Sequence, residues 1–523
     1  MKITKYLCAI LLAGTLTACG DSFLEPEDSN VASSEAVQEE SSNDPDKVLG
    51  SQLDGVYQAL NMGSPFSTGG IADHQSQGLV GVMMLSNNMS NDISLHMDGD
   101  PWHYDKQLDY YAEIYVRAMW PWNLFYTVIN RANTIIPLIS EDATNMQARA
   151  TLGQALALRA LSYYYLAQYY QDTYVTSKNK PCVPLLLESL DGSITSRATV
   201  EQVYAQIETD LLKAITLLDG WKRDSKALID QQVAKGLLAR VYLMMHKWTK
   251  AAELANQARQ GYALMDVVTA ETANYQDINN SEVMWGLDIT DINSRIYASF
   301  QSWMCATDMG YGGQVGCFQL IDAKLYSTMP ENDVRRRLFV APGTTLPTEA
   351  GFEVPAYANL KFKKVENWLG DYVYMRSAEM YLTEAEALVR LNRADEAYQV
   401  LSELMVNRRT DGKYEMNRAT IEEVQKQRRL ELWGEGFSYY DHRRWQMDMN
   451  RGYEGTNEHR SAWPAHPGYS NGFVPWYHYS WRFQLPQREI NENEDISPED
   501  QNVVGEEGNQ DPVADKITDW SEK

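Results

Sequence analysis

The chain has 523 residues, of which 44% are hydrophobic and 22% are charged, and its formal net charge is −25. Nucleic acids and anionic surfaces repel so acidic a chain, which argues against both as partners. Beyond the N-terminus no stretch of about 20 apolar residues is free of charge, so the sequence also excludes a membrane-spanning helix there.

The first residues carry an export signal. A basic start at Lys2 and Lys5 and an apolar run from Tyr6 match a secretory signal peptide, and the run is too short to span a bilayer. The run ends in LTAC, residues 16–19, which resembles a bacterial lipobox, where the cysteine is acylated and becomes the first residue of the mature chain. We predict a lipoprotein signal peptide over residues 1–18 and lipidation of Cys19. An ordinary signal peptide with a chance cysteine is the alternative.

Two acidic segments flank the body of the chain. Residues 25–46 are rich in Ser, Asp and Glu and hold almost no large apolar side chains, so burial cannot offset the entropy lost on ordering them. We predict a flexible lipidated tether over residues 19–46 and a single domain over residues 47–523, with an acidic, irregular tail from about residue 491.

Helical periodicity dominates between these segments. Residues 120–139 and 152–170 are amphipathic, with apolar side chains recurring every three or four positions. Arg159 lies on the apolar stripe of the second helix, so we expect a carboxylate of a neighbouring helix to pair with it. Thr199 and Gln202 form a capping box that predicts another helix over residues 199–218.

Two later segments predict helical hairpins. Matched stripes cover residues 234–245 and 251–262, and a second pair covers 374–388 and 394–408. Breaks between them fall at His246-Lys247 and near Asn392-Arg393. A capping box at Thr420 opens a last helix, predicted over residues 424–445. Such pairs resemble tetratricopeptide (TPR) units, so we expect a mostly α fold, a scaffold of degenerate TPR helix pairs with long irregular loop insertions.

The insertions are residues 61–112, 265–365 and 446–490, and they are rich in Gly, Asn, Asp, Trp and Tyr. Weak alternation at 282–289 and 479–486 predicts short strands. After loss of Cys8 and lipidation of Cys19, three cysteines remain, and Cys305 and Cys317 flank a glycine-rich loop. They are the likelier disulfide pair, leaving Cys182 free, and buried free thiols are the alternative.

Signatures of catalysis and metal binding are missing. The sequence has no GxSxG, HExxH, P-loop or Rossmann glycine motif and no Cys/His metal spacing. The carboxylate pairs Glu384/Glu386 and Glu431/Glu435 could in principle serve a glycosidase. Both pairs lie on predicted scaffold helices, where solvated faces or salt bridges explain them better. We predict no enzyme activity, no cofactor and no metal.

Several stretches form a pattern that is specific in combination. They are residues 122–136, 153–173, 237–255, 372–391, 428–445 and 483–493. In this order they closely resemble the SusD/RagB family of Bacteroidetes outer-membrane lipoproteins, over most of the chain between about 50 and 495, and the lipobox agrees. Gln154 is a small departure, because the family often has Glu there.

The resemblance implies a non-enzymatic lipoprotein of the outer membrane that faces the cell exterior. SusD-like proteins form the lid of a SusC-like, TonB-dependent transporter, capture a nutrient and deliver it into the barrel. The nutrient is often an oligosaccharide, and in the RagB branch it is a peptide. The alternative from a different class is a protein-interaction scaffold without a small-molecule ligand.

Two loop stretches suit a sugar site, because sugars bind flat aromatic faces beside polar side chains. Trp102 and Tyr104 lie among polar residues in DPWHYD, and Trp303 and Tyr311 lie in SWMCATDMGYGGQVGC together with Asp308. Glycines in the second stretch let the backbone approach a ligand closely. We predict ligand contact by Trp102 and Trp303 first and by Tyr104 and Tyr311 second. Loop packing is the alternative for each ring, and Trp285, Trp120, Trp122 and Trp433 are assigned to core or scaffold.

Overall fold

The computed structural model describes residues 45–61, 74–109, 111–189, 195–466, 471–510 and 516–522. They belong to two units, residues 1–51 and residues 52–523, and the second unit is described below. The predicted signal peptide, Cys19 and most of the predicted tether lie outside the described residues. No helix among the described residues is long and apolar enough to cross a membrane.

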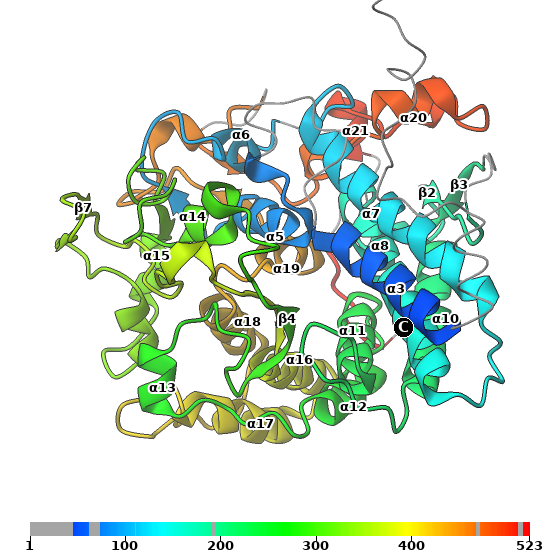
Figure 1. Cartoon of the computed structure of the whole chain (residues 1–523). Helices are drawn as coiled ribbons and strands as arrows, with labels where there is room; N and C mark the ends of the chain where they lie inside the picture. The colour runs from blue at the N-terminus through cyan, green and yellow to red at the C-terminus, as the bar shows by residue number, and fades with distance from the viewer. Residues whose placement is uncertain are drawn as a thin grey trace, which may run out of the picture. The chain divides into compact units, whose positions relative to one another are not determined.

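The first group of helices is α7 (Val116–Ile135), α8 (Met146–Tyr170) and α10 (Val200–Leu217), which pack side by side (Figure 1). The expected capping box opens α10, where Thr199 and Gln202 exchange hydrogen bonds. Arg159 on α8 pairs with Asp210 on α10 at 2.8 Å and also donates to Asn133 on α7. The predicted partner for Arg159 is therefore confirmed, and it links all three helices.

The second group consists of the helical hairpins. These are α11 (Gln231–Met244) with α12 (Trp248–Ala258), and α16 (Ser377–Arg390) with α17 (Ala394–Val406). The predicted breaks are confirmed, because His246 and Asn392 have φ of 57° and 60° and reverse the chain. Figure 1 shows α12, α16 and α17 in one layer, with α18 (Ile421–Glu431) above them.

Two sequence expectations about helices are wrong. Tyr374 belongs to strand β8, and its helix begins only at Ser377. The helix expected over residues 424–445 is broken into α18 and α19 (Ser438–Arg444), because Gly434 and Gly436 adopt φ of 78° and 85°. A Cβ on Gly436 would lie 2.6 Å from the Met83 side chain, so this turn requires glycine.

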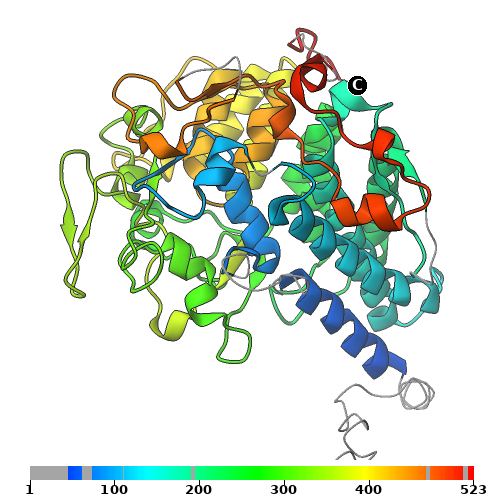
Figure 2. The same ribbon diagram turned by 90° about the horizontal axis from the view of Figure 1, so that it is seen from above.

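Five antiparallel two-stranded ribbons support the loops of the described chain. They are β1 (Ile93–Leu95) with β5 (Gln319–Ile321), β2 (Pro181–Pro184) with β3 (Arg197–Thr199), β4 (Val283–Leu287) with β8 (Tyr372–Arg376), β6 (Leu346–Pro347) with β7 (Glu353–Val354), and β9 (Met449–Asn450) with β10 (Phe473–Val474). The ribbon β6–β7 projects from its surroundings in Figures 1 and 2. The strand expected at 282–289 is confirmed as β4, whereas residues 479–486 form a 3₁₀ turn and irregular chain.

Short helices complete the unit. The α-helices are α5 (Gly78–Asn88), α6 (His103–Gln107), α9 (Tyr174–Ser177), α13 (Val267–Thr272), α14 (Phe300–Met304), α15 (Ala323–Ser327), α20 (Gln487–Glu492) and α21 (Gly505–Gln510). The 3₁₀ helices are η2 (Ile136–Leu138), η3 (Ile296–Ala298), η4 (Val334–Leu338), η5 (Glu366–Trp368), η6 (Arg460–Ala462), η7 (Tyr479–Trp481) and η8 (Pro498–Asp500). Helix α3 (Pro45–Asn61) begins in the first unit and ends in the second.

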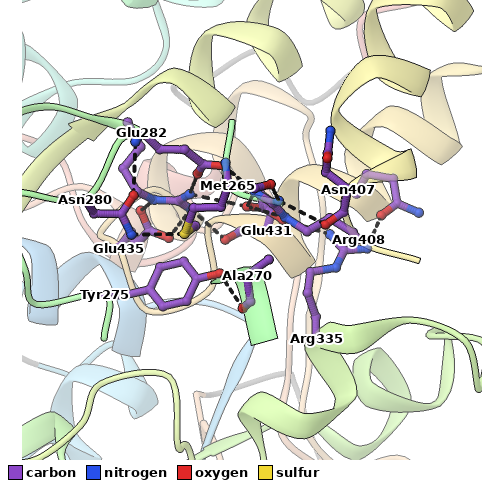
Figure 3. A network of polar contacts seen from close by, with 12 residues as sticks. Met265, Ala270, Tyr275, Asn280, Glu282, Arg335, Asn407, Arg408, Glu431 and Glu435 are labelled. Atoms are coloured by element: carbon purple, nitrogen blue, oxygen red, sulfur yellow. Dashed lines mark hydrogen bonds and ion pairs between the residues drawn. The ribbon is translucent and has the colours of Figure 1, made fainter. Parts of the chain in front are cut away.

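A buried ion-pair cluster holds α18 to the strand and loops around it. Its members are Glu282, Arg335, Lys361, Arg376, Arg408, Glu431 and Glu435. Arg408 donates to Glu431 at 2.9 Å and to Glu282 at 2.7 Å (Figure 3). Arg376 bridges Glu282 and Glu435. Glu431 and Glu435 therefore serve salt bridges, as the sequence analysis favoured over glycosidase chemistry. Likewise, Glu386 pairs with Arg444 and Glu384 with Arg259.

The three cysteines of the body are free and buried, so the expected Cys305–Cys317 disulfide is not formed. The loop between them is closed by other bonds. The Cys317 backbone N–H donates to the Tyr311 carbonyl at 2.9 Å, and that of Gly312 donates to the Ser302 carbonyl at 2.8 Å. Backbone hydrogen bonds thus hold the loop without a covalent link.

Candidate ligand-binding site

A layered group of rings lies where α14 meets the glycine-rich loop of residues 305–317. We call Trp102, Trp303, Tyr311, Tyr297 and His74 the aromatic cluster. The Trp303 and Tyr311 rings stack with centroids 3.9 Å apart at 7°, and Tyr297 lies 4.6 Å from Tyr311. Trp102 meets Trp303 edge to face at 5.6 Å, and His74 contacts both tyrosines. Three of the four predicted ligand residues are therefore brought together.

The rings of the cluster differ sharply in exposure. Trp102 is 0% exposed and Trp303 1%, whereas Tyr297 is 36% exposed and Tyr311 is half-buried. Trp102 and Trp303 thus have no open face, and this counts against the direct ligand contact expected of them. Trp303 supports Tyr311 by stacking on it, and Trp102 packs against Trp303. Tyr297 is the exposed ring of the cluster, and Tyr311 and His74 are half-buried.

The Tyr104 ring packs against a ring that is not part of the aromatic cluster. Tyr104 is 39% exposed and its ring packs against His103 at 3.7 Å. Tyr297, in η3, was not singled out from the sequence. The only signal in the sequence was that Tyr297 is an aromatic residue in the same insertion as Trp303 and Tyr311. Many other residues of that insertion are also aromatic, so this signal does not single out Tyr297.

The glycines of residues 305–317 serve the loop itself. A Cβ on Gly310 would lie 2.6 Å from Ser302 Oγ, and one on Gly313 would lie 2.0 Å from the Asp308 carbonyl oxygen. Asp308 accepts a hydrogen bond from the Gln301 side chain at 2.6 Å. These positions let the loop pack against α14 and its own backbone, in place of the close ligand approach expected from the sequence.

A cleft of about 530 Å³ adjoins the aromatic cluster. Its lining includes Asn61, Gln77, Asn293, Ser294, Arg295, Trp285, Tyr372 and Tyr374. Gln77 Nε2 donates to the His74 carbonyl at 2.5 Å, and the same carbonyl accepts from Trp303 Nε1 at 2.8 Å. The His74 carbonyl therefore links the cluster to Gln77, which lines the cleft beside Asn293 and Arg295.

Burial raises the pKa of two groups at the cluster. The pKa of Tyr311 rises to about 12, so its hydroxyl, protonated at neutral pH like that of any tyrosine, resists ionisation further into the alkaline range. Burial also raises the pKa of Asp100 to about 7, and Asp100 Oδ1 accepts from the Trp102 backbone N–H at 2.9 Å. Neither shift creates a strong nucleophile or base at the open rings.

The described residues contain no group of three or more His, Cys, Asp and Glu side chains placed to hold a metal ion. Asp92, which is buried, accepts hydrogen bonds from Arg429 at 2.7 Å and from Ser438 at 2.8 Å. The site thus combines aromatic faces with neutral and cationic donors, an arrangement that suits reversible binding of a hydroxylated or amide-rich ligand.

Comparison with known proteins matches residues 49–243 to a family model described as SusD-like, starch-binding and associating with the outer membrane. Residues 350–504 match the model of the SusD family, SusD_RagB. The chain belongs to the SusD/RagB family. The family is one of binding proteins that are not enzymes, as the sequence predicted.

Relatives support this membership in the family over most of the chain. A SusD-like protein of Bacteroides ovatus is 22% identical over 416 residues, which cover 70% of this chain and 71% of the relative. The crystal structure of a SusD-like carbohydrate binding protein from Bacteroides vulgatus is 25% identical, with a TM-score of 0.73, and covers 87% of this chain and 98% of that one. Surface glycan-binding protein A from Bacteroides uniformis shares the fold at 20% identity and a TM-score of 0.62, covering 86% of this chain and 98% of that chain.

Proposed function

We propose that this protein is a lipid-anchored, surface-exposed lipoprotein of the outer membrane that binds an oligosaccharide. The bound sugar is then delivered to a SusC-like, TonB-dependent transporter, and the helical hairpins act as degenerate TPR pairs that form the rigid scaffold. The observation that carries the proposal is the contact between the exposed Tyr297 ring and the half-buried Tyr311 ring, next to a cleft lined by amides.

The chemistry of the site matches a sugar. The apolar C–H face of a pyranose stacks on a tyrosine ring, and its hydroxyls need donors and acceptors at the ring edge. Asn293, Arg295 and Gln77 supply these in the cleft. The stacked Trp303 fixes Tyr311 in place, so less conformational freedom is lost on binding.

Tyr297→Ala combined with Tyr311→Ala should weaken glycan binding at least about tenfold, because each stacked ring contributes on the order of 1 kcal/mol. Affinity gel electrophoresis and a glycan array with the whole protein measure this. Tyr104→Ala is the matched control, because that ring is exposed but outside the cluster. Full retention of ligand by the double variant would reject the site.

The experiment also separates the alternatives. A wild-type chain that retains no glycan of the array but binds oligopeptides would be a RagB-like peptide binder. One that binds neither, while still associating with the transporter, would be an interaction scaffold. The double variant Trp102→Ala with Trp303→Ala is less informative, since removing two buried tryptophans costs on the order of 3–5 kcal/mol each.

The anchor has its own test. Labelling of cells with radioactive palmitate should mark the wild-type protein and not Cys19→Ala, because the lipobox cysteine is the expected acylation site. Three acyl chains would give stable membrane attachment, whereas one chain is marginal. Equal labelling of both proteins would remove the proposed anchor, and with it the delivery role.

A further inference from the structure

The C-terminal segment of the chain, residues 516–522, returns to the turn of the α11–α12 hairpin. The Trp520 ring stacks on His246 with centroids 5.0 Å apart, and the guanidinium of Arg390 lies 3.8 Å from its centre. Trp248 Nε1 donates to the Trp520 carbonyl at 2.8 Å. His246 in turn stacks on Trp248 at 4.4 Å. Ring stacking, a cation–π contact and a backbone hydrogen bond therefore hold Trp520 against the hairpin.

A carboxylate two residues later meets the start of α12. Thr249 donates to Glu522 with its backbone N–H and with its hydroxyl, each at 2.8 Å. The N-cap residue Lys247 supplies no side-chain acceptor to the first turn. Helix N-termini leave such N–H groups unpaired and favour negative charge, so Glu522 caps the first turn of α12.

Two side chains of the tail, spaced two positions apart, make the contacts with the hairpin. An indole ring and a carboxylate two positions further on reach separate points of the hairpin. Upstream, the Ile517 backbone N–H donates to Gln446 Oε1 at 2.5 Å. Residues 516–522 lie beyond the segments matched by either family model, so the tail is a feature of this chain outside the matched family core.

We propose that the end of the α11–α12 hairpin is a peptide-docking site for an aromatic residue followed two positions later by a carboxylate. The chain's own tail occupies and blocks this site until a partner protein that presents the same pattern displaces it. This inference uses residues outside the aromatic cluster and the cleft, so it does not depend on the proposed glycan site.

Displacement is physically reasonable. The tail is held by one ring and a few hydrogen bonds, and Glu522 and Lys516 are exposed, where ionic contacts are weak. Covalent attachment gives the tail an effective concentration in the mM range. A partner therefore has to bind more tightly than the tail itself, and removal of the tail should reveal the site to a free peptide.

The test uses the chain truncated after residue 515 and a fluorescent peptide of residues 516–523, KITDWSEK. Fluorescence anisotropy should show saturable binding to the truncated protein and at least about tenfold weaker binding to the full chain. The same peptide carrying Trp520→Ala should lose at least tenfold in affinity. Absence of saturable binding to the truncated protein, or equal binding of both peptides, would overturn the proposal.

Three variants complete the design. Full-length Trp520→Ala should bind the wild-type peptide as the truncated chain does, because its site is open. In the truncated chain, Arg390→Ala should lower the affinity for the peptide, because Arg390 contacts the Trp520 ring. Arg393→Ala should leave the affinity unchanged, since Arg393 pairs with Glu396 on the following helix. Circular dichroism confirms that each variant is folded. Equal loss in both arginine variants would refute the assigned contact.

Discussion

Glu431→Gln is expected to lower the free energy of unfolding by about 3–5 kcal/mol, the usual cost of removing one partner from a buried ion pair. Glu431 accepts hydrogen bonds from Arg408 at 2.9 and 3.0 Å and lies 3.3 Å from both Arg335 and Arg376. All of these side chains are buried, so water cannot replace the lost charge. Three guanidiniums would then share too few carboxylates.

Urea denaturation monitored by tryptophan fluorescence measures this loss. Glu349→Gln, on an exposed stretch of the ribbon loop, removes the same charge and should leave the midpoint unchanged. If the two variants unfold at the same urea concentration, the ion-pair cluster does not stabilise the fold as argued.

Acid adds a second readout for the same residue. Burial alone would raise the pKa of Glu431, but Arg408, Arg376 and Arg335 outweigh it and hold the pKa well below its usual value of 4.5. A carboxyl with a lowered pKa contributes stability above pH 4.5, and this contribution fades as the pH falls below that value. The wild type should therefore lose stability more steeply than Glu431→Gln in this range.

The sequence predicts local features of this fold well and long-range ones poorly. The α11–α12 hairpin and the capping box at Thr199 were predictable because their signals lie within a few neighbouring residues. Arg159 could be said to need a carboxylate, since a charge on an apolar stripe must be paired. Which carboxylate it meets depends on how α8 and α10 pack, and the sequence does not show that.

The ion-pair cluster could not be predicted from patterns of neighbouring residues. Glu282, Arg376 and Glu431 come from segments that are far apart in the chain, and only the folded arrangement brings them together. The broken helix at Gly434 and Gly436 has the same cause. Its apolar pattern continues through the glycines, and the contact that requires the turn comes from distant Met83.

Ring exposure at the candidate site also depends on contacts between segments that are far apart in the chain. Composition and loop position were enough to select Trp102, Trp303 and Tyr311, which do meet. Whether a face is open depends on what covers it. Trp303 is stacked on Tyr311, packs edge to face with Trp102 and is 1% exposed, so the role of ligand contact passes to Tyr311 and Tyr297.

Gly313→Ala is expected to reduce glycan binding at least about tenfold, the equivalent of about 1.4 kcal/mol. The new Cβ would lie 2.0 Å from the Asp308 carbonyl oxygen and 2.8 Å from the Phe352 ring, so the backbone of the loop has to move. Tyr311 lies two residues away and stacks on Trp303 at 3.9 Å. Moving the loop therefore displaces Tyr311, one of the two rings proposed to contact the sugar.

Binding is measured by affinity gel with the glycan of the array that the wild type retains, and the environment of Trp303 by near-UV circular dichroism. Gly55→Ala in α3 is the matched control, because only the Arg131 guanidinium, 3.8 Å away, approaches its Cβ position. Within a helix this change should stabilise slightly, by about 0.5–1 kcal/mol, and leave binding intact. Wild-type affinity in Gly313→Ala would mean that Tyr311 does not contact the sugar, since the loop that carries it cannot keep its position.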